Sequence, residues 1–203
     1  MNRNVEKWIW LIIGTVIAAL GMSLINMAAL GNVILTVLWD GMSQKMPLSI
    51  GLASYMTSIL MICFLWFYDR RQIRLGTIVH FLLFGAFMDF FNTTPIFSQT
   101  LYGRLSGMVL GVLLLSIGIG IYAFANLGRG PYEGICFAIS DKMGIELKYV
   151  RTVLDASFAA IGFALGGSIG LATVVNLIMS GMLIQKTMET LKTRAQKSAS
   201  VSL

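Results

Sequence analysis

Charged residues are scarce in this chain. Asp, Glu, Lys and Arg make up only 12% of its 203 residues, whereas soluble domains carry roughly 25%. Hydrophobic residues account for 57%, and the mean hydropathy is +0.80. This composition excludes an ordinary soluble domain and predicts an integral membrane protein.

Residues that carry common catalytic or metal chemistry are also few. His80 is the only histidine, and no HExxH motif is present. The two cysteines, Cys63 and Cys136, fall in unrelated segments with no further soft ligands beside them, so we expect neither a disulfide nor a metal site. No phosphate loop or nucleotide fingerprint occurs in the sequence. We therefore expect no enzymatic activity and no cofactor.

Long apolar runs dominate what is present. Several reach the length of about 20 residues that crosses a bilayer as a helix, and the shorter ones need flanking polar residues to complete the crossing. We expect an all-α, polytopic membrane protein with six transmembrane helices. The runs cover residues 8–30, 50–68, 77–91, 105–127, 149–165 and 171–184.

Two shorter helices are expected where glycine and proline break the long runs. Gly31 ends the first run before a short segment at residues 33–46. Gly128, Gly130 and Pro131 end the fourth run, and Pro131 suits the first position of the helix that follows. That helix would be about 20 Å long at 1.5 Å per residue, and a bilayer core is about 30 Å thick. We expect both short helices to re-enter the membrane or to lie at its interface.

The placement of basic residues predicts an orientation. With the amino terminus in the cytoplasm and six crossings, all basic residues except Lys45 and Arg104 fall on the cytoplasmic side. This is a strong positive-inside bias, and it makes both termini cytoplasmic. Membrane topology therefore explains the formal net charge of +6, and we expect no nucleic acid partner.

The two halves of the chain resemble each other. When the chain is shifted by 97 residues, glycines of the first long run and of the break after it coincide with glycines of the second half. A duplication of about 95 residues explains this likeness. The coincident pairs include Gly14 with Gly111, Gly21 with Gly118, and Gly31 with Gly128.

Each half holds three crossings and one short helix. Because three is an odd number, the halves must have opposite orientations, and such inverted repeats with interrupted helices are typical of secondary transporters. The binding site is then expected near the midplane, between the halves. The expected units are a first repeat at 1–97, an inverted second repeat at 98–189, and a basic cytoplasmic tail at 190–203. We expect the tail to fray.

The second half carries the most polar cluster. Glu133 stands at the helix break, and Arg151 and Asp155 lie four residues apart, which puts them on one helix face. Charges inside a membrane are costly unless they are paired or hydrated, so these three residues are candidates for a substrate or ion pathway. The alternative is that Arg151 extends to the cytoplasmic interface and Asp155 merely compensates its charge.

Four further polar residues are candidates for the same pathway. Asp40 is either a solvated acid at the interface or a residue that lines a cavity. His80 is either a hydrogen-bonded histidine at a helix start or a proton relay. Asp89 either lines the pathway or reaches the outer headgroups. Asn176 lies in the last apolar run.

At these residues the sequence resembles the YczE-like bacterial membrane proteins, which are loosely grouped with the YitT and YyaS families. Residues 128–131 look like the family's G-x-G-P, with an acidic residue after it at Glu133. Arg151 and Asp155 follow the family's pattern of an arginine and an acid four residues apart. The resemblance covers nearly the whole chain and implies a multi-pass protein of the bacterial cytoplasmic membrane.

The first half follows the family pattern less closely. Gly85 and Asp89 look like the family's glycine and aspartate in this region. The family's G-x-x-P-W-D is replaced by residues 31–36, which contain no proline and no acid, and Trp39 and Asp40 come one turn later. This departure gives the second half more weight in a site.

The function that these features favour is a small secondary transporter or exporter, with a small molecule or an ion as its substrate. One alternative is a non-transporting accessory or regulatory subunit that binds a partner enzyme through its basic cytoplasmic face. Another is the substrate-binding subunit of a vitamin or metal importer. The expected partners are the lipid bilayer, the substrate, and a second copy of the chain or another protein.

Overall fold

The secondary structure is helical throughout the computed structural model, which describes residues 3–48, 50–92 and 100–201. These ranges hold eight α-helices and one short 3-10 helix, and they contain no strand. The all-α prediction is therefore confirmed. The helices are α1 (Arg3–Ala28), α2 (Ile34–Lys45), α3 (Ile50–Tyr68), η1 (Arg70–Gln72), α4 (Leu75–Asn92), α5 (Leu101–Phe124), α6 (Pro131–Met143), α7 (Leu147–Ala164) and α8 (Leu171–Val201).

Three of the helices are long and apolar enough to cross a bilayer. These are α1, α5 and α8, with apolar segments of 24 to 26 residues. Helices α3 and α4 contain shorter apolar segments, and α7 is 18 residues long and bears the buried charges described below. Each of the six apolar runs in the sequence thus forms a helix.

The two short helices begin after sharp bends. Helix α2 has 12 residues and α6 has 13. The bends place Ala29 and Asn126 at φ values of 49° and 53°, and Gly31 and Gly128 at 107° and 127°. Glycine is required at the latter two positions because other residues avoid such angles. Pro131 is the first residue of α6, as the sequence predicts.

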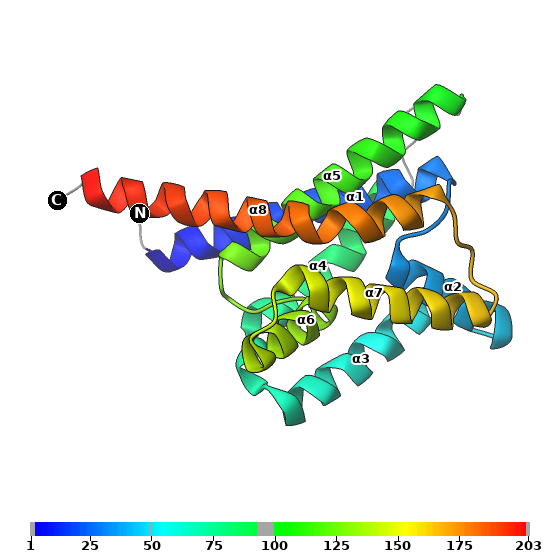
Figure 1. The fold of residues 1–203 in the computed structure, drawn as a ribbon, viewed down its shortest axis with the longest axis horizontal. Helices are drawn as coiled ribbons and strands as arrows, with labels where there is room; N and C mark the ends of the chain where they lie inside the picture. The colour runs from blue at the N-terminus through cyan, green and yellow to red at the C-terminus, as the bar shows by residue number, and fades with distance from the viewer. Residues whose placement is uncertain (1–2, 49, 93–99, 202–203) are drawn as a thin grey trace.

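Backbone hydrogen bonds hold both bends. The backbone amide of Ala172 donates to the Leu30 carbonyl at 3.0 Å, and the backbone amide of Gly76 donates to the Leu127 carbonyl, also at 3.0 Å. Each bend is thereby tied to the first turn of another helix, α8 in one case and α4 in the other. Figure 1 shows the chain turning back from the ends of α1 and α5 toward the middle of the molecule, where α2 and α6 begin.

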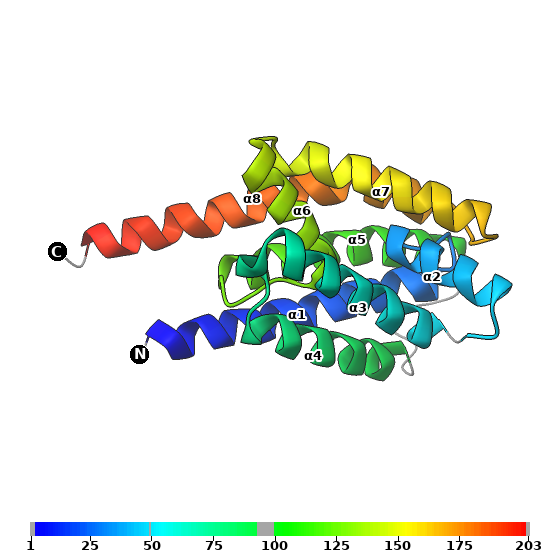
Figure 2. The ribbon, with the colours of Figure 1, turned by 90° about the horizontal axis from the view of Figure 1, so that it is seen from below.

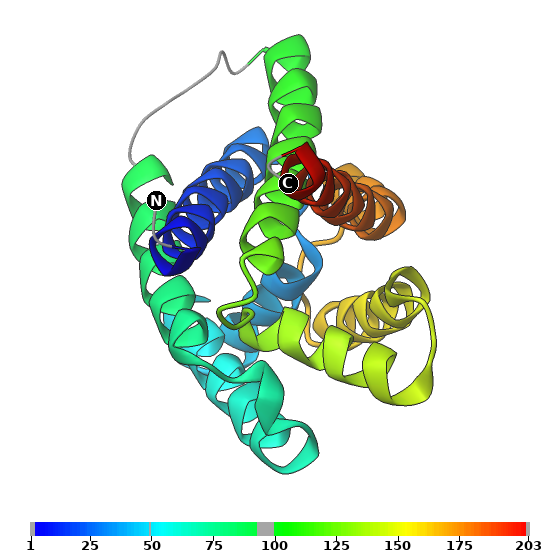
Figure 3. The same ribbon diagram turned by 90° about the vertical axis from the view of Figure 1, so that its left-hand side faces the viewer.

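The helices form two layers. Helix α1 packs on α4 and α5, and α5 also packs on α8; in the other layer α2 packs on α3 and α7, and α6 packs on α3 and α7. Figure 3 views the two layers along the long axis of the molecule. They meet mainly where α7 packs on α8. Helices α3 and α4 follow each other in the chain but do not pack along their lengths.

The carboxyl-terminal segment differs from the sequence prediction. Residues 190–201 continue α8 as a regular helix and are not frayed. This segment contains strong helix formers such as Leu, Lys, Arg, Ala and Gln. Just before it, Gln185 donates a hydrogen bond to Glu189 one turn on, at 2.9 Å. Figure 2 shows the end of α8 projecting from the bundle at the same end of the molecule as the start of α1.

Candidate functional site

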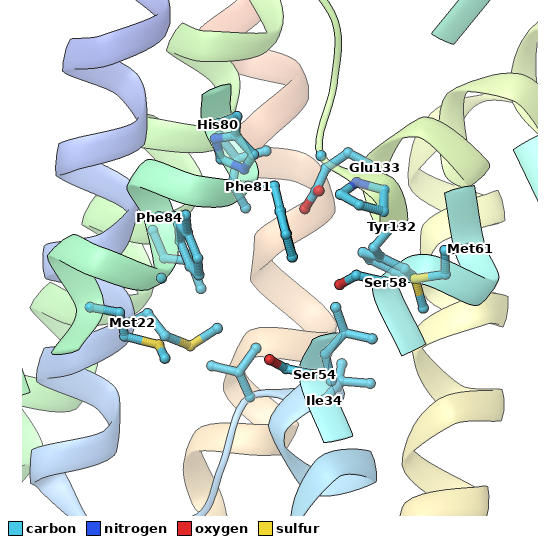
Figure 4. Close-up of a pocket in the computed structure, with 18 of the residues that line it drawn as sticks. Met22, Ile34, Ser54, Ser58, Met61, His80, Phe81, Phe84, Tyr132 and Glu133 are labelled. Atoms are coloured by element: carbon cyan, nitrogen blue, oxygen red, sulfur yellow. The ribbon is translucent and has the colours of Figure 1, made fainter. Parts of the chain in front are cut away.

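A cavity of about 160 Å³ lies between the two layers. All eight α-helices contribute side chains to its wall, and the first residues of α2 and α6 form part of it. Figure 4 shows His80 and Glu133 at one end of the cavity, and Met22 and Ile34 with the Ser54 hydroxyl at the other. The apolar residues include Met22, Ile34, Met61, Phe81, Phe84, Met88, Leu115 and Ile119.

The polar end contains the charge cluster that the sequence singled out. The Arg151 guanidinium lies 3.8 Å from a Glu133 carboxylate oxygen and 3.6 Å from an Asp155 oxygen. The hydroxyl of Tyr132 donates to Asp155. Only 7% of the Arg151 side chain is exposed. Its guanidinium therefore lies inside the protein, whereas the alternative interpretation of the sequence had it extend to the cytoplasmic interface. One guanidinium therefore faces the buried Asp155 carboxylate and the partly buried Glu133 carboxylate.

His80 lies in the same wall, from helix α4. Its ring stacks on Tyr122 with 4.0 Å between the centroids, and its Nδ1 lies 2.8 Å from the Thr15 hydroxyl oxygen. That hydroxyl donates its only hydrogen to the Leu11 carbonyl at 2.7 Å, so Nδ1 carries the hydrogen that completes this contact. The Nε2 of the neutral ring is then a hydrogen-bond acceptor near the start of α6.

Four buried polar atoms in the wall have no hydrogen bond of standard geometry among the described residues: Arg151 Nε, Asp155 Oδ2, the Tyr122 hydroxyl and the side-chain nitrogen of Asn176. The first two lie 3.6 Å apart in an ion pair, and the Tyr122 hydroxyl interacts with the Glu133 carboxylate. Asn176 is 1% exposed and lines the cavity. Buried polar groups are nearly always hydrogen-bonded in folded proteins. The Asn176 nitrogen therefore points to a polar ligand or water in the cavity.

The remaining candidates lie elsewhere. Asp40 does not line the cavity: it accepts a hydrogen bond from the Ser168 backbone amide at 2.9 Å and so holds the loop between α7 and α8. Asp89 falls in α4, but its side chain lies outside the described part of the structure. Gly31 and Gly128 form the bends before the short helices, and they shape the cavity through the backbone.

The sequence was expected to hold no G-x-S-x-G motif of serine hydrolases, but the loop at residues 166–170 matches this pattern. In such enzymes the serine stands on a turn between a strand and a helix, beside a histidine. Here the loop joins two helices, and the only histidine contacts Thr15 and Tyr122 instead. The match therefore lacks the strand-to-helix turn and the neighbouring histidine that a serine hydrolase requires.

A second, basic cleft lies at the bend between η1, α4 and α6. Gln72 is buried at its centre: its amide nitrogen donates to Asp69 at 3.0 Å, and its carbonyl oxygen accepts from Arg129 at 2.5 Å. In the sequence, the only sign of this cleft is the run of basic residues at 69–74. That run had been interpreted only as evidence for the orientation of the chain in the membrane. The lining residues are Asp69, Arg71, Gln72, Arg74, Asn126, Arg129, Asp141 and Lys142.

The Asp69 carboxyl in this cleft has a pKa below its ordinary value of 3.8. Partial burial acts to raise this pKa, but the hydrogen bonds from Gln72 and from the Arg71 backbone lower it, and the charges of Arg71 and Lys142 add to that effect. Asp69 also caps η1 by accepting from the Arg71 amide at 3.1 Å. The ionised form of Asp69 is therefore part of the local structure.

Within the described ranges, no group of three or more His, Cys, Asp or Glu side chains is arranged to hold a metal ion. The polar end of the cavity can instead bind organic groups through charge and hydrogen bonds. Its donors are Arg151, Asn176 and Tyr122, and its acceptors are Glu133 and Asp155.

The fold and the cavity define an all-helical membrane protein with a charged cluster buried between two helix layers. The chain belongs to the family of unknown function DUF6198, whose family model matches residues 5–189.

Curated relatives agree with this assignment. The uncharacterized membrane protein YczE of Bacillus subtilis (strain 168) is 29% identical over 182 residues, which are 89% of this chain and 85% of that protein. The uncharacterized protein YyaS of the same organism is 28% identical over 182 residues, 88% and 90% of the two chains. An uncharacterized protein of Haemophilus influenzae is 29% identical over 171 residues, 83% and 77%. The resemblance seen in the sequence is thus confirmed, and no solved structure matches the chain.

Proposed function

We propose that this protein is a small secondary transporter whose substrate binds in the central cavity. The observation that carries this proposal is the pairing of Arg151 with two carboxylates, the partly buried Glu133 and the buried Asp155, in a cavity at the start of two short helices. Substrate sites of many secondary transporters are built where interrupted helices begin near the middle of the membrane. A purely structural core has little reason to keep three charges there.

The transporter is built from two inverted repeats of three spans each. In this arrangement each helix of the first half corresponds to the helix four places later in the chain: α1 to α5, α2 to α6, α3 to α7 and α4 to α8. The packing pattern supports the correspondence: α1 packs on α4 as α5 packs on α8, and α2 packs on α7 as α6 packs on α3. Both described ends of the chain lie at one end of the molecule, as an even number of crossings requires.

The bends before the short helices support the same correspondence. The positive φ angles fall at Ala29 and Gly31 in one half and 97 residues later, at Asn126 and Gly128, in the other. The hydrogen bonds that hold the bends also correspond, because each joins the last residue before the break to the start of α8 or of α4. Two unrelated segments would have no reason to share these details.

One contact breaks the correspondence and indicates how the cavity opens. Helix α7 packs closely on α8, whereas α3 and α4 meet through single side chains such as Tyr55 and Phe81. A helical hairpin can separate only at the end away from its loop. The α3–α4 loop holds the basic run that predicts a cytoplasmic position, so this hairpin opens the cavity toward the outer side. The α7–α8 hairpin has its loop at the other end and would open the cavity toward the cytoplasm, which gives alternating access.

The cluster also offers a means of coupling. Two carboxylates and one guanidinium leave one excess negative charge when all three are ionised, and such a charge in a membrane requires a cation. A proton or a cationic substrate on Glu133 would meet this requirement. His80, with its acceptor nitrogen near the start of α6, is placed to receive a proton from the same region.

Alternating access can be tested by cysteine labelling from each side of the membrane. Ser58 of α3 lines the cavity, so Ser58→Cys, with Cys63→Ser, is treated with a membrane-impermeant methanethiosulfonate reagent in right-side-out and in inverted vesicles. We expect modification from both sides. Cys63 lies on the exposed face of the same helix and, in a chain that keeps Ser58, is the control, which should react from neither side. Modification of Ser58→Cys from one side alone contradicts transport.

A second function, as an accessory subunit, is favoured by one observation. The end of α8 projects beyond the bundle as a helix, where a partner protein can reach it. Deletion of residues 190–203 distinguishes the two functions. The deletion leaves cavity labelling unchanged in a transporter, whereas an accessory protein loses its biological effect although its cavity is intact.

A further inference from the structure

Resting on the proposed function, we propose that the substrate is a small amphipathic organic amine, bound as a cation with its ammonium group at Glu133 and its apolar body among the Met and Phe side chains of the cavity. The cavity volume, the arrangement of its wall and the charge of its polar end support this chemical class.

The charge argument rests on how the two carboxylates are engaged. Asp155 accepts a hydrogen bond from Tyr132 and pairs with Arg151 on its own helix. The Glu133 carboxylate lies 3.8 Å from the same guanidinium, which is beyond a hydrogen bond. Glu133 also stands in the first turn of α6 and lines the cavity. It is therefore the acceptor best placed for an ammonium group.

Aromatic rings surround the position that the ammonium would take. Phe81 stands between His80 and Glu133 in the cavity wall, as Figure 4 shows. Tyr132 and Phe84 also line the cavity. Ring faces attract cations, and the attraction is strongest where water is excluded. An anionic head group would instead be repelled by the Glu133 carboxylate and by the negative faces of these rings.

The other end of the cavity suits an apolar body. Met22 of α1 and Ile34 of α2 lie there, with the Ser54 hydroxyl beside them. An apolar cavity of roughly 150 Å³ accommodates a molecule the size of benzene, so the volume of about 160 Å³ fits one ring or a short branched chain. Flexible methionines adapt to bodies of different shape.

The route of entry agrees with an amphipathic substrate. Along the line where α3 and α4 do not pack, Tyr55 meets Phe81 edge-to-face with 5.1 Å between the ring centroids. Tyr55 is 45% exposed, so this aromatic pair stands between the cavity and the surface of the bundle that faces lipid. Amphipathic amines collect at the membrane interface and can reach this pair from the bilayer.

The test compares three probes with one aromatic body and different head groups. Thermal unfolding of the purified protein in detergent is measured with phenethylamine, phenethyl alcohol and 3-phenylpropanoate. Because a hydrogen bond to a charged group contributes about 1.5–3 kcal/mol, we expect the amine to bind at least about tenfold more tightly than the alcohol, and the acid to bind most weakly. Glu133→Gln should abolish the preference for the amine. Glu189→Gln, on the exposed part of α8, is the matched control and should retain it.

A second variant separates this inference from the proposed function. A Cβ at Gly85 would meet only the Tyr55 hydroxyl, at 3.7 Å, so Gly85→Leu can fold and fill the cavity, and it should abolish stabilisation by every probe. If the alcohol or the acid binds wild-type protein as well as the amine does, the amine inference is overturned while the cavity remains a binding site. If no probe stabilises the wild type more than Gly85→Leu, the inference and the substrate cavity both fail.

Discussion

Gly14 of α1 and Gly118 of α5 stand face to face where these helices cross. A Cβ on Gly14 would lie 2.8 Å from the Gly118 carbonyl oxygen, and one on Gly118 would lie 2.6 Å from that of Gly14. Gly21 and Gly111 repeat the arrangement at 2.7 and 2.8 Å. The helices run antiparallel, so Gly14 packs against the counterpart of Gly21, and Gly21 packs against the counterpart of Gly14. The proposed inverted repeat accounts for this exchange.

Replacing Gly14 with alanine should separate α1 from α5. The new methyl group meets backbone atoms that cannot move aside, and overpacking of this kind costs about 1–3 kcal/mol. We expect the free energy of unfolding in mixed micelles to fall by that amount. Gly181→Ala is the control, because its Cβ would have only ordinary contacts, the nearest at 3.5 Å. Equal stability of the two variants would contradict the close crossing.

Replacing Gly128 with alanine should disrupt the bend before α6. Gly128 has a φ of 127°, and a Cβ added to it would lie 2.6 Å from the Thr77 amide nitrogen. In the alanine variant, backbone strain and a steric clash would therefore both lower the stability. Gly144→Ala isolates the strain, since Gly144 has a φ of 66° but open space around its Cβ. Left-handed strain alone costs about 1–2 kcal/mol. We expect Gly128→Ala to lower the melting temperature clearly more than Gly144→Ala, and the opposite order would be evidence against this bend.

Removing the Arg151 side-chain charge should be more harmful than removing the whole charge cluster. Arg151→Met leaves Glu133 and Asp155 buried without a cation, and breaking a buried pair costs about 3–5 kcal/mol. The triple variant Arg151→Met, Glu133→Gln, Asp155→Asn leaves no buried charge. We expect its free energy of unfolding to recover a large part of the loss. A triple variant less stable than Arg151→Met would show that the three charges do not act as one cluster.

The contribution of Asp69 to stability should depend on pH. Its folded pKa is lowered, so its ionised form stabilises the fold above the unfolded pKa of about 3.9, and this contribution is lost as the pH falls through the still lower folded pKa. The melting temperature of wild type should therefore exceed that of Asp69→Asn near neutral pH. We expect the difference to narrow below about pH 4. A difference that stays constant down to pH 2 would contradict the role of the carboxylate.

Local features of the site could be predicted well. Gly31, Gly128 and Pro131 mark the helix breaks because their backbone preferences do not depend on distant residues. Arg151 and Asp155 are one turn apart on a helix, so their proximity follows from spacing alone. Two local expectations were wrong. The carboxyl-terminal segment is helical and not frayed, and the G-x-S-x-G pattern that was expected to be absent occurs at residues 166–170.

Contacts between distant segments could not be predicted from spacing. Asp40 holds the amide of Ser168, although it had been a candidate for the pathway. His80 meets Thr15 and Tyr122, and no periodicity in the sequence pairs these three residues. Such contacts depend on how helices pack, and packing is decided by the shapes of many side chains together.

The sequence by itself determined that this is a helical membrane protein, because the length and hydropathy of an apolar run are sufficient to make it a membrane helix. It also determined where the chain breaks and where its charges occur. Only the tertiary structure decided that Glu133 of α6 meets Arg151 of α7 and that all eight α-helices enclose one cavity. Between helices in lipid the hydrophobic effect gives no direction, and close packing, hydrogen bonds and ion pairs select the arrangement.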